Sequence, residues 1–423
     1  MTTRDELIKD LNGEGRDKRL KAIRYLEPAS EAYNASERRD TNNHIHSKYS
    51  FSPYYPSKAA WLAFEAGLAT AGIVDHDSCA GAKEFIEAAA ILGLPVTTGI
   101  EVRVDMGGTK LKEMRLNNQD QNGNAYVTLQ GLPHQRLNSI NEFLAPYRKE
   151  RCLRTQKMAE GIGAILQKHG IPYSFENDVL PISQYQSGGT ITERHMLYAL
   201  ALRIIQTVGK GEGLSNYLIQ NWNINVPDKT KMLLDDPQNP HYEYDMLGLL
   251  KAEFLDKVYI AADRECPKAE DLLKLSKETG AIPAYCYLGD QNVSVTGDKK
   301  AMEFEDRNLE TILYEAKAMG FKAVEYMPTR NTDEQIVRLK EICRQLELFE
   351  ICGEDINQPR QKFICEKMRK PLFEDAYDCS WALVGHELSI SQGGEGLLDG
   401  TKLEKRITGF AEQTRNEYHA KQG

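Results

Sequence analysis

The stretch TNNHIHSKYSFSPYYPSKAAWLAFEAGLATAGIVDHD, residues 41–77, has the pattern of a strand, a helix and a second strand. HIH is a short strand, SKAAWLAFEAG (57–67) carries small and apolar residues in helical spacing, and AGIVDHD (71–77) is a strand that ends in polar residues. The helix GAKEFIEAAAILG (81–93) and the strand LPVTTGIEVRVD (94–105), which again ends in charge, continue the pattern. This alternation predicts parallel strands joined by crossover helices.

Beyond residue 105 the pattern pauses and later returns. Residues 107–124 have the composition of a loop, AYVTLQGL is another strand, and residues 138–280 are mostly helical. Strands and helices alternate again from AIPAYCYLG (281–289) to LFEICGEDI. We therefore expect a barrel of residues 41–137 and 281–365, a helical insertion or cap at 138–280, an N-terminal helical extension at 1–40 and a C-terminal extension at 366–423.

The composition is that of a large globular protein, with 41% hydrophobic and 27% charged residues. The formal net charge of -9 argues against a general nucleic-acid surface, although a local basic pocket stays open. No apolar run approaches the length that spans a bilayer, and the charged N-terminus lacks an apolar signal core. The eight cysteines form no CxxC pair, which fits reduced thiols, so we expect a cytoplasmic location.

Histidines and carboxylates stand at the ends of four predicted strands. In a strand, positions i and i+2 point to the same side, as His44 and His46 would. Chemistry in parallel α/β folds gathers at the carboxyl ends of the strands, and imidazoles with carboxylates suit a divalent metal. The other residues at these ends are Asp75, His76, Asp77, Glu101, Glu354 and Asp355.

In that order, HIHS, IVDHDSCAG and TGIE resemble the first three motifs of the PHP (polymerase and histidinol phosphatase) metallophosphoesterases. GAIPAYCYLGD, MGFKAVEYMPTRN and ICGEDINQP follow the remaining course of the family, so the resemblance extends over about residues 41–365. It implies an α/β fold, a distorted TIM-like (β/α)7 barrel with up to three metals. It also implies hydrolysis of a small phosphate ester by a metal-activated water.

The resemblance also implies metal ligands. His44, His46, Glu101 and Asp355 match one complete metal site, and His76 matches a ligand of another. Weaker candidates are His134, which would join the second site only if its loop folds inward, and Asn357. At positions where the family usually has ligands, this chain has Phe51, Thr128, Tyr287 and Asn357. We therefore expect one well-occupied site, holding Zn, Mn or Fe, rather than three.

Other polar residues are candidates for catalysis and substrate binding. Arg194 and His195, in ITERHMLYAL, resemble a family segment near the start of a cap helix, and they suit a phosphate group. A salt bridge at the helix start is the alternative. Asp75 or Asp77 would orient ligands or act as a general base, and His76 would orient substrate or water. In an alternative interpretation, which stays open, Asp75 holds a loop by hydrogen bonds and His76 only fills space.

Two further segments have simpler interpretations. For RKERCLR (148–154) we favour a solvated helix face over a polyanion site, and His386 fits a packed structural role. The main hypothesis is a metal-dependent phosphoesterase acting on a small phosphorylated substrate, with no membrane or nucleic-acid partner. One alternative is a PHP-like protein that has lost catalysis and binds a phosphometabolite. Another is a mononuclear hydrolase of amides or lactones.

Overall fold

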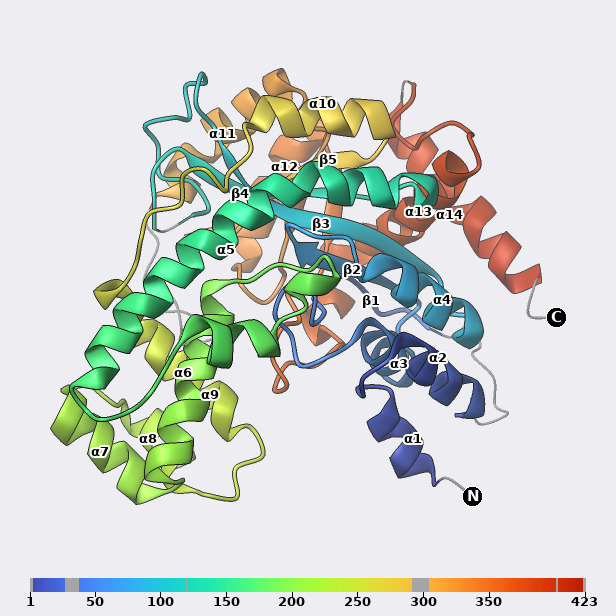
Figure 1. Cartoon of the computed structure of the whole chain (residues 1–423). Helices are drawn as coiled ribbons and strands as arrows, with labels where there is room; N and C mark the ends of the chain where they lie inside the picture. The colour runs from blue at the N-terminus through green and yellow to red at the C-terminus, as the bar shows by residue number, and fades with distance from the viewer. Residues whose placement is uncertain (1–2, 27–37, 119, 291–303, 401, 421–423) are drawn as a thin grey trace.

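The structure, a computed structural model, describes residues 3–26, 38–118, 120–290, 304–400 and 402–420. Within these residues, seven strands form one sheet in which neighbours along the chain are neighbours in space (Figure 1). The strands are β1 (Thr41–Ile45), β2 (Thr70–His76), β3 (Val96–Asp105), β4 (Asn124–Gln130), β5 (Ile282–Tyr287), β6 (Ala323–Tyr326) and β7 (Phe349–Cys352).

The sheet curves until its two edges nearly meet. Ile356, just after β7, accepts a hydrogen bond from the backbone of His46 at 3.0 Å, and its own N–H donates to His44 at 3.0 Å. Gly353 permits this approach, because a Cβ there would lie 2.8 Å from both the Asn42 Oδ1 and the Asn43 backbone nitrogen. The expected distorted TIM-like barrel is thereby confirmed.

One strand departs from the parallel arrangement. β1, β2 and β3 are parallel, as are β5, β6 and β7, but β4 runs antiparallel to both β3 and β5. The connection from β3 to β4 carries no helix among its described residues. A parallel neighbour needs a long crossover, whereas a simple loop returns the chain in the opposite direction. The barrel therefore has seven strands but not seven regular β/α units.

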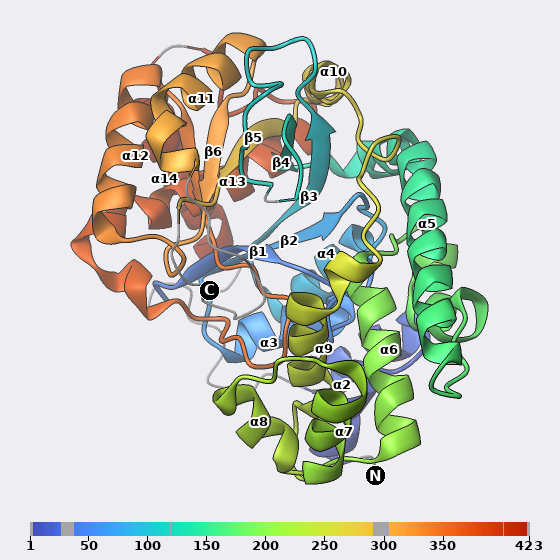
Figure 2. The same ribbon diagram turned by 90° about the vertical axis from the view of Figure 1, so that its left-hand side faces the viewer.

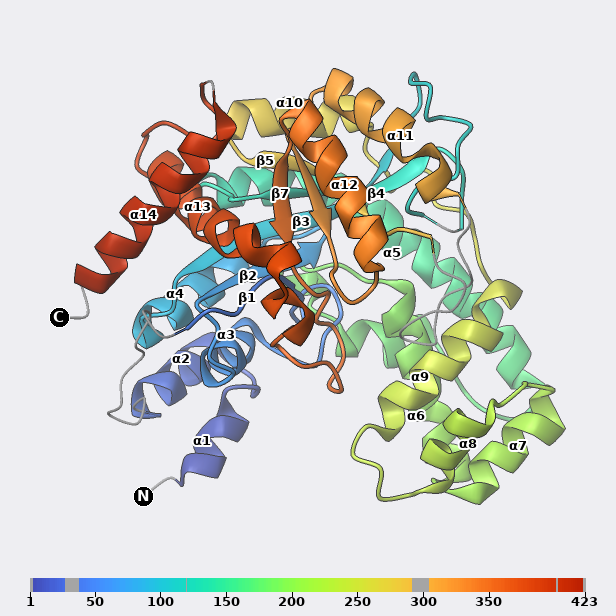
Figure 3. The ribbon, with the colours of Figure 1, turned by 180° about the vertical axis from the view of Figure 1, so that it is seen from behind.

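Helices cover the outside of the sheet, and several connect parallel strands (Figure 3). In α12, Thr332 and Gln335 form a capping box at the first turn, and Ile336, Leu339 and Cys343 are buried on one side. The helices in the barrel part of the chain are α3 (Pro56–Glu65), α4 (Ala82–Leu92), α11 (Glu305–Met319) and α12 (Asp333–Leu346).

A helical lobe stands beside the barrel. The long helix α5 leads from β4 into this lobe, which lies below the barrel in Figures 1 and 2. The lobe has an apolar cluster of its own, which includes Met158, Leu200 and Leu250, and Phe51 from the barrel joins it. The helices between β4 and β5 are α5 (Leu137–Gln167), α6 (Glu193–Val208), α7 (Glu212–Trp222), α8 (Asp228–Asp235), α9 (Tyr242–Glu253) and α10 (Ala269–Thr279).

The two ends of the chain pack on the barrel. α1 (Arg4–Asp10) and α2 (Arg16–Tyr25) belong to the predicted N-terminal extension, whose residues 27–37 lie outside the described residues, as do 291–303. α13 (Glu374–Ser391) and α14 (Leu403–Ala420) pack together at the C-terminus, and α13 covers the amino ends of the strands. The predicted domain boundaries stay a prediction. Among the described helices, none combines the length and apolarity needed to cross a membrane.

Candidate metal centre

Two histidines and two carboxylates converge near the carboxyl ends of β1 and β7, and Glu101 comes from the middle of β3, level with the end of β2. The Nε2 atoms of His44 and His46 lie 3.2 Å apart, and both lie about equally far from Glu101 Oε2, at 3.5 and 3.6 Å. Asp355 Oδ1 lies 3.2 Å from His46 Nε2. Tetrahedral ligands about 2.1 Å from a Zn²⁺ stand about 3.4 Å from one another, so these spacings fit one divalent ion.

Hydrogen bonds on the far side of each ring orient both histidines toward this centre. Ser50 donates its hydroxyl to Asp75 at 2.6 Å and lies 3.1 Å from His46 Nδ1, so it accepts the proton of that nitrogen. His44 Nδ1 lies 2.5 Å from a carboxylate oxygen of Glu325 and must donate to it, because a carboxylate only accepts. When both rings are neutral, each Nε2 therefore presents a lone pair to the other, an arrangement that a cation between them would stabilise.

The charges around the centre favour a positive ion. Burial disfavours a charged imidazole, yet the carboxylates of Glu325 and Glu101 hold the pKa of His44 well above its ordinary value of 6.5. Burial alone would raise the pKa of Glu101, but the neighbouring histidines, His76 first, lower it to about 2. A carboxylate that stays ionised beside two imidazole nitrogens is the donor set that borderline divalent metals prefer.

His76, at the end of β2, lies next to the centre. Its Nδ1 is 3.0 Å from Glu101 Oε2, and its ring centroid is 4.7 Å from that of His46. Burial lowers the pKa of His76 to about 3, so the ring is neutral at neutral pH. A neutral ring at this place, next to Glu101 and on the cavity, can orient substrate or water.

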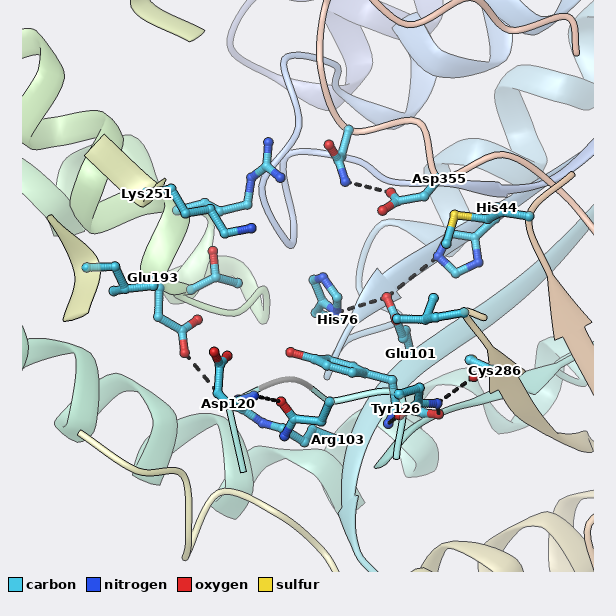
Figure 4. A pocket seen from close by; sticks show the side chains of 18 of the residues that line it. His44, His76, Glu101, Arg103, Asp120, Tyr126, Glu193, Lys251, Cys286 and Asp355 are labelled. Atoms are coloured by element: carbon cyan, nitrogen blue, oxygen red, sulfur yellow. Dashed lines mark hydrogen bonds and ion pairs between the residues drawn. The ribbon is translucent and has the colours of Figure 1, made fainter. Parts of the chain in front are cut away.

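His44, His76, Glu101 and Asp355 line one side of a cavity of about 400 Å³. Figure 4 shows His44, His76, Glu101 and Asp355 on this wall, with Glu193 and Lys251 facing them across the cavity. Arg103, Arg151 and Arg194 also line the cavity. A volume of this size accommodates a small ligand, and the arginines can hold an anionic group beside the centre.

Asp75 and Asp77 lie outside this cavity lining. Asp75 accepts hydrogen bonds from the backbone and hydroxyl of Ser47, at 2.7 and 2.6 Å, and from Ser50. Asp77 pairs with Arg151. Burial raises the pKa of both carboxyls. These contacts favour supporting roles over general-base catalysis, and they agree with the alternative that Asp75 holds a loop.

The adjacent residues Arg194 and His195 separate in the fold. Arg194 lines the cavity, and its guanidinium lies 5.1 Å from the centroid of the Phe51 ring. His195 is buried at the start of α6, where Nδ1 accepts from the Thr192 backbone at 3.1 Å and thereby caps the helix. Burial lowers the pKa of His195 to about 3. Arg194 can meet a substrate, whereas His195 is committed to the helix start.

The prediction that His134 could join a second metal site needs correction. His134 lies at the opposite end of the barrel, where its Nε2 is 2.9 Å from Glu387 of α13. The loop after β4 emerges there because β4 runs antiparallel to β3, so the end of β4 lies beside Thr98 and Gly99, near the start of β3. His386 is buried in α13 and accepts from the Leu397 backbone at 3.0 Å, as a packed structural residue would.

The positions with non-ligand residues have other contacts. Phe51 packs against His195, Tyr198 and Tyr244 in the apolar core of the lobe. Thr128 donates to Glu325, and Tyr287 donates to Asp306 at 2.5 Å. Asn357 donates to Asp355 Oδ1 at 2.6 Å, so it holds a predicted ligand of the first site. The number of metals stays a prediction.

Two features were missed or misjudged from the sequence. Glu325, in the strand FKAVEYMP, was not among the candidates, although it is the acidic residue in the middle of that apolar strand. The segment RKERCLR is not a solvated helix face, because Arg148, Arg151 and Arg154 are buried. Their spacing of three puts them on one side of α5, where Asp77, Glu193 and Glu265 pair with them.

Comparison with known proteins supports the resemblance. A 5'-3' exoribonuclease of Haemophilus influenzae is 25% identical over 181 residues, 42% of this chain. The match covers 56% of that enzyme, so the chain spans about half the length of this curated relative. Residues 42–175 match the PHP domain.

Two solved structures share the fold. A candidate metal-dependent phosphoesterase from Bifidobacterium adolescentis has a TM-score of 0.50 and 19% identity, over 79% of this chain and 96% of its own. An amidohydrolase from Chromobacterium violaceum, with bound sulfate and no metal, has a TM-score of 0.50 and 16% identity, over 79% of this chain and 93% of its own. The residues that match the PHP domain, 42–175, include His44, His46, His76 and Glu101.

Proposed function

We propose that this protein is a metal-dependent hydrolase that cleaves a small phosphate ester. The observation that carries the proposal is the pair of Nε2 atoms of His44 and His46, 3.2 Å apart. Two carboxylates lie beside them, and the group borders a cavity lined by His44, Glu101 and Asp355. His44, His46, Glu101 and Asp355 would hold one divalent ion, Zn, Mn or Fe. When bound, the ion supplies Lewis acidity toward water and toward the phosphoryl oxygens.

The residues of the chain divide the remaining work. Arg194 would bind and orient the phosphate, while Arg103 and Arg151, which are paired with Glu265 and Asp77, add positive charge to the same cavity. His76, a neutral ring on the same cavity, would orient the attacking water. Asp75 would keep His46 in place through Ser50. Asp75 and Asp77 would support the site through these contacts rather than act as the general base.

The substrate class rests on the arginines and on the relatives. The resemblance to PHP phosphoesterases and the match to an exoribonuclease both direct attention to phosphate esters. A small ester is favoured over a long polynucleotide, because the net charge of -9 disfavours a general nucleic-acid surface. Short phosphodiesters belong in the same substrate screen as phosphomonoesters.

The test is a phosphate-ester screen of the full chain loaded with Zn²⁺, Mn²⁺ or Fe²⁺, together with metal analysis. We expect turnover of at least one ester and one ion per chain. His46→Ala should lose metal and turnover together, while His134→Ala, at the far end of the barrel, should keep both. Full turnover in His46→Ala would contradict the site, and three ions at full occupancy would contradict the single-metal centre.

A second candidate, a binding protein without turnover, is favoured by the substituted positions Phe51, Thr128 and Tyr287. In this case the screen would be silent with every metal, while a phosphorylated ligand would still raise the unfolding temperature. Hydrolysis of amides or lactones instead of phosphate esters would identify the third candidate, a mononuclear amidohydrolase.

A further inference from the structure

Glu325 lies at the end of a chain of hydrogen bonds that leads to the metal centre. Its carboxylate is 4% exposed and comes from β6, across the barrel from His44. One oxygen, Oε1, accepts from His44 Nδ1 at 2.5 Å. The other, Oε2, accepts from the Gln130 amide at 2.9 Å and from the Thr128 hydroxyl. Both oxygens are therefore committed.

This arrangement selects one tautomer and one orientation of His44. An imidazole that donates from Nδ1 presents a lone pair at Nε2, the atom that faces His46 and Glu101. Without an acceptor at Nδ1, the proton could move to Nε2, or the ring could turn over, and the lone pair would then leave the centre. Hydrogen bonds to the far nitrogen of a metal-binding histidine have this effect in general.

Thr128 and Gln130 in turn hold Glu325. They lie on the same side of β4, two residues apart, so both side chains reach the same oxygen. Thr128 also occupies the position where the resemblance places a histidine ligand. In this chain the side chain at that position cannot bind a metal as an imidazole would. It instead donates a hydrogen bond to Glu325, which holds the predicted ligand His44.

We propose that Glu325 is a positioning residue that fixes His44 with Nε2 toward the metal, and that Thr128 and Gln130 hold Glu325 for this task. The inference rests on the proposed metal centre but not on the substrate or on turnover. It assigns a function in metal binding to three residues that the sequence patterns did not.

The chain contains a matched control in Glu387. This glutamate of α13 is also buried, also pairs with a histidine, His134, at 2.9 Å, and also accepts from a threonine hydroxyl, that of Thr97, at 2.8 Å. It lies at the amino ends of the strands, away from the centre. A change in Glu387 therefore reproduces the loss of a buried carboxylate without touching the predicted ligands.

Glu325→Gln is the sharpest single change. Because Thr128 and Gln130 both donate to Oε2, the amide oxygen must occupy that place, and the amide NH₂ then faces the N–H of His44. The two donors repel, which favours the tautomer with its proton on Nε2. In Zn²⁺ titrations of metal-free protein by calorimetry, we expect affinity to fall about 10- to 100-fold, as for other partners of metal-binding histidines. Glu387→Gln should leave Zn²⁺ affinity unchanged.

Thr128→Val, with Thr97→Val as its control, covers the case in which Glu325→Gln does not fold. The valine removes one donor to Glu325 and keeps the shape, so we expect a smaller loss of Zn²⁺ affinity than in Glu325→Gln, and none in Thr97→Val. Nitrogen-15 NMR of the Zn²⁺-loaded protein should show His44 bound through Nε2 in wild type and a mixture of the two nitrogens in Glu325→Ala.

Wild-type affinity in folded Glu325→Gln and Thr128→Val, or equal losses in the Glu387 and Thr97 controls, would overturn the inference. Failure of the proposed hydrolase would have a different signature, with tight Zn²⁺ binding that depends on Glu325 but no turnover of any ester. A wild-type protein that binds no Zn²⁺, Mn²⁺ or Fe²⁺ would remove the metal centre and the inference together.

Discussion

The barrel holds one buried glutamate near each end, and the two have nearly the same partners. Glu325 accepts from His44, Thr128 and Gln130 at the carboxyl ends of the strands. Glu387 accepts from His134 and from the hydroxyls and backbone at Thr97 and Thr98 at the amino ends. The residue types alone do not separate a candidate metal centre from a structural contact.

The difference lies in what the second nitrogen of each histidine meets. The Nε2 of His44 faces a second imidazole and a carboxylate inside the barrel. His134 is bound to Glu387 through Nε2, and its side chain is 34% exposed at the surface. At the carboxyl end the glutamate orients a potential ligand, whereas at the amino end it ties α13 to β3. The comparison teaches that the surroundings of the histidine decide the chemistry.

The largest expected effect separates the two histidines. His44→Ala removes one of four predicted ligands, so we expect Zn²⁺ affinity to fall by more than about 100-fold, beyond the loss from an outer hydrogen-bond partner. His134→Ala should leave Zn²⁺ affinity unchanged. Calorimetric titration of both metal-free variants makes the measurement, and comparable losses in the two would break the distinction between the ends of the barrel.

The next effect is expected from Glu387→Ala, and on stability rather than on metal binding. The alanine leaves the buried backbone N–H of Thr98 and the Thr97 hydroxyl without their acceptor, which should lower the free energy of unfolding by about 3 kcal/mol. Urea denaturation of the metal-free protein provides the value, with Zn²⁺ titration as the control. A variant as stable as wild type would show that α13 does not depend on this contact.

The smallest effect concerns pH. The hydrogen bond with Glu387 raises the pKa of His134 above its ordinary value of 6.5. A raised pKa means that the folded state binds the proton more tightly. The stabilisation is therefore full below pH 6.5, the value in the unfolded chain, and is lost as pH rises through the folded pKa.

Urea denaturation of wild type and His134→Gln across this range tests the sign. The difference in the free energy of unfolding should be largest at acidic pH and should shrink as pH rises. The change should be modest, because the side chain of His134 is partly exposed to water. A difference that grows with pH would mean that His134 is bound as a neutral ring.

Much of the fold could be predicted because its signals are local. The strands that contain HIH and AGIVDHD and the helix GAKEFIEAAAILG lie where periodicity and strand-end polarity place them. The direction of β4 was not predictable in this way. The direction of β4 depends on whether the connection between β3 and β4 is a crossover helix or a simple loop. A polar segment that contains glycines is compatible with both kinds of connection.

The residues of the candidate site also differ in whether local sequence patterns could predict them. The spacing of His44 and His46 placed both imidazoles on one side. The polar residues at the end of β2 and in β3 included His76 and Glu101, which lie beside that pair. Only the fold showed which of the weaker candidates lie near this site. His195 turns to a helix cap, and His134 leaves from the opposite end of the barrel.

By itself, the sequence determined the alternation of strands and helices, and the histidine pair with carboxylates at the strand ends. These features depend on neighbours a few residues apart. Only the tertiary structure decided that Glu325 meets His44, 281 positions away, and that Arg151 faces the cavity. Such contacts exist because β7 closes against β1 and α5 folds back over the sheet. The sequence around a polar residue on one strand does not identify the residue that it will contact on another strand of a barrel.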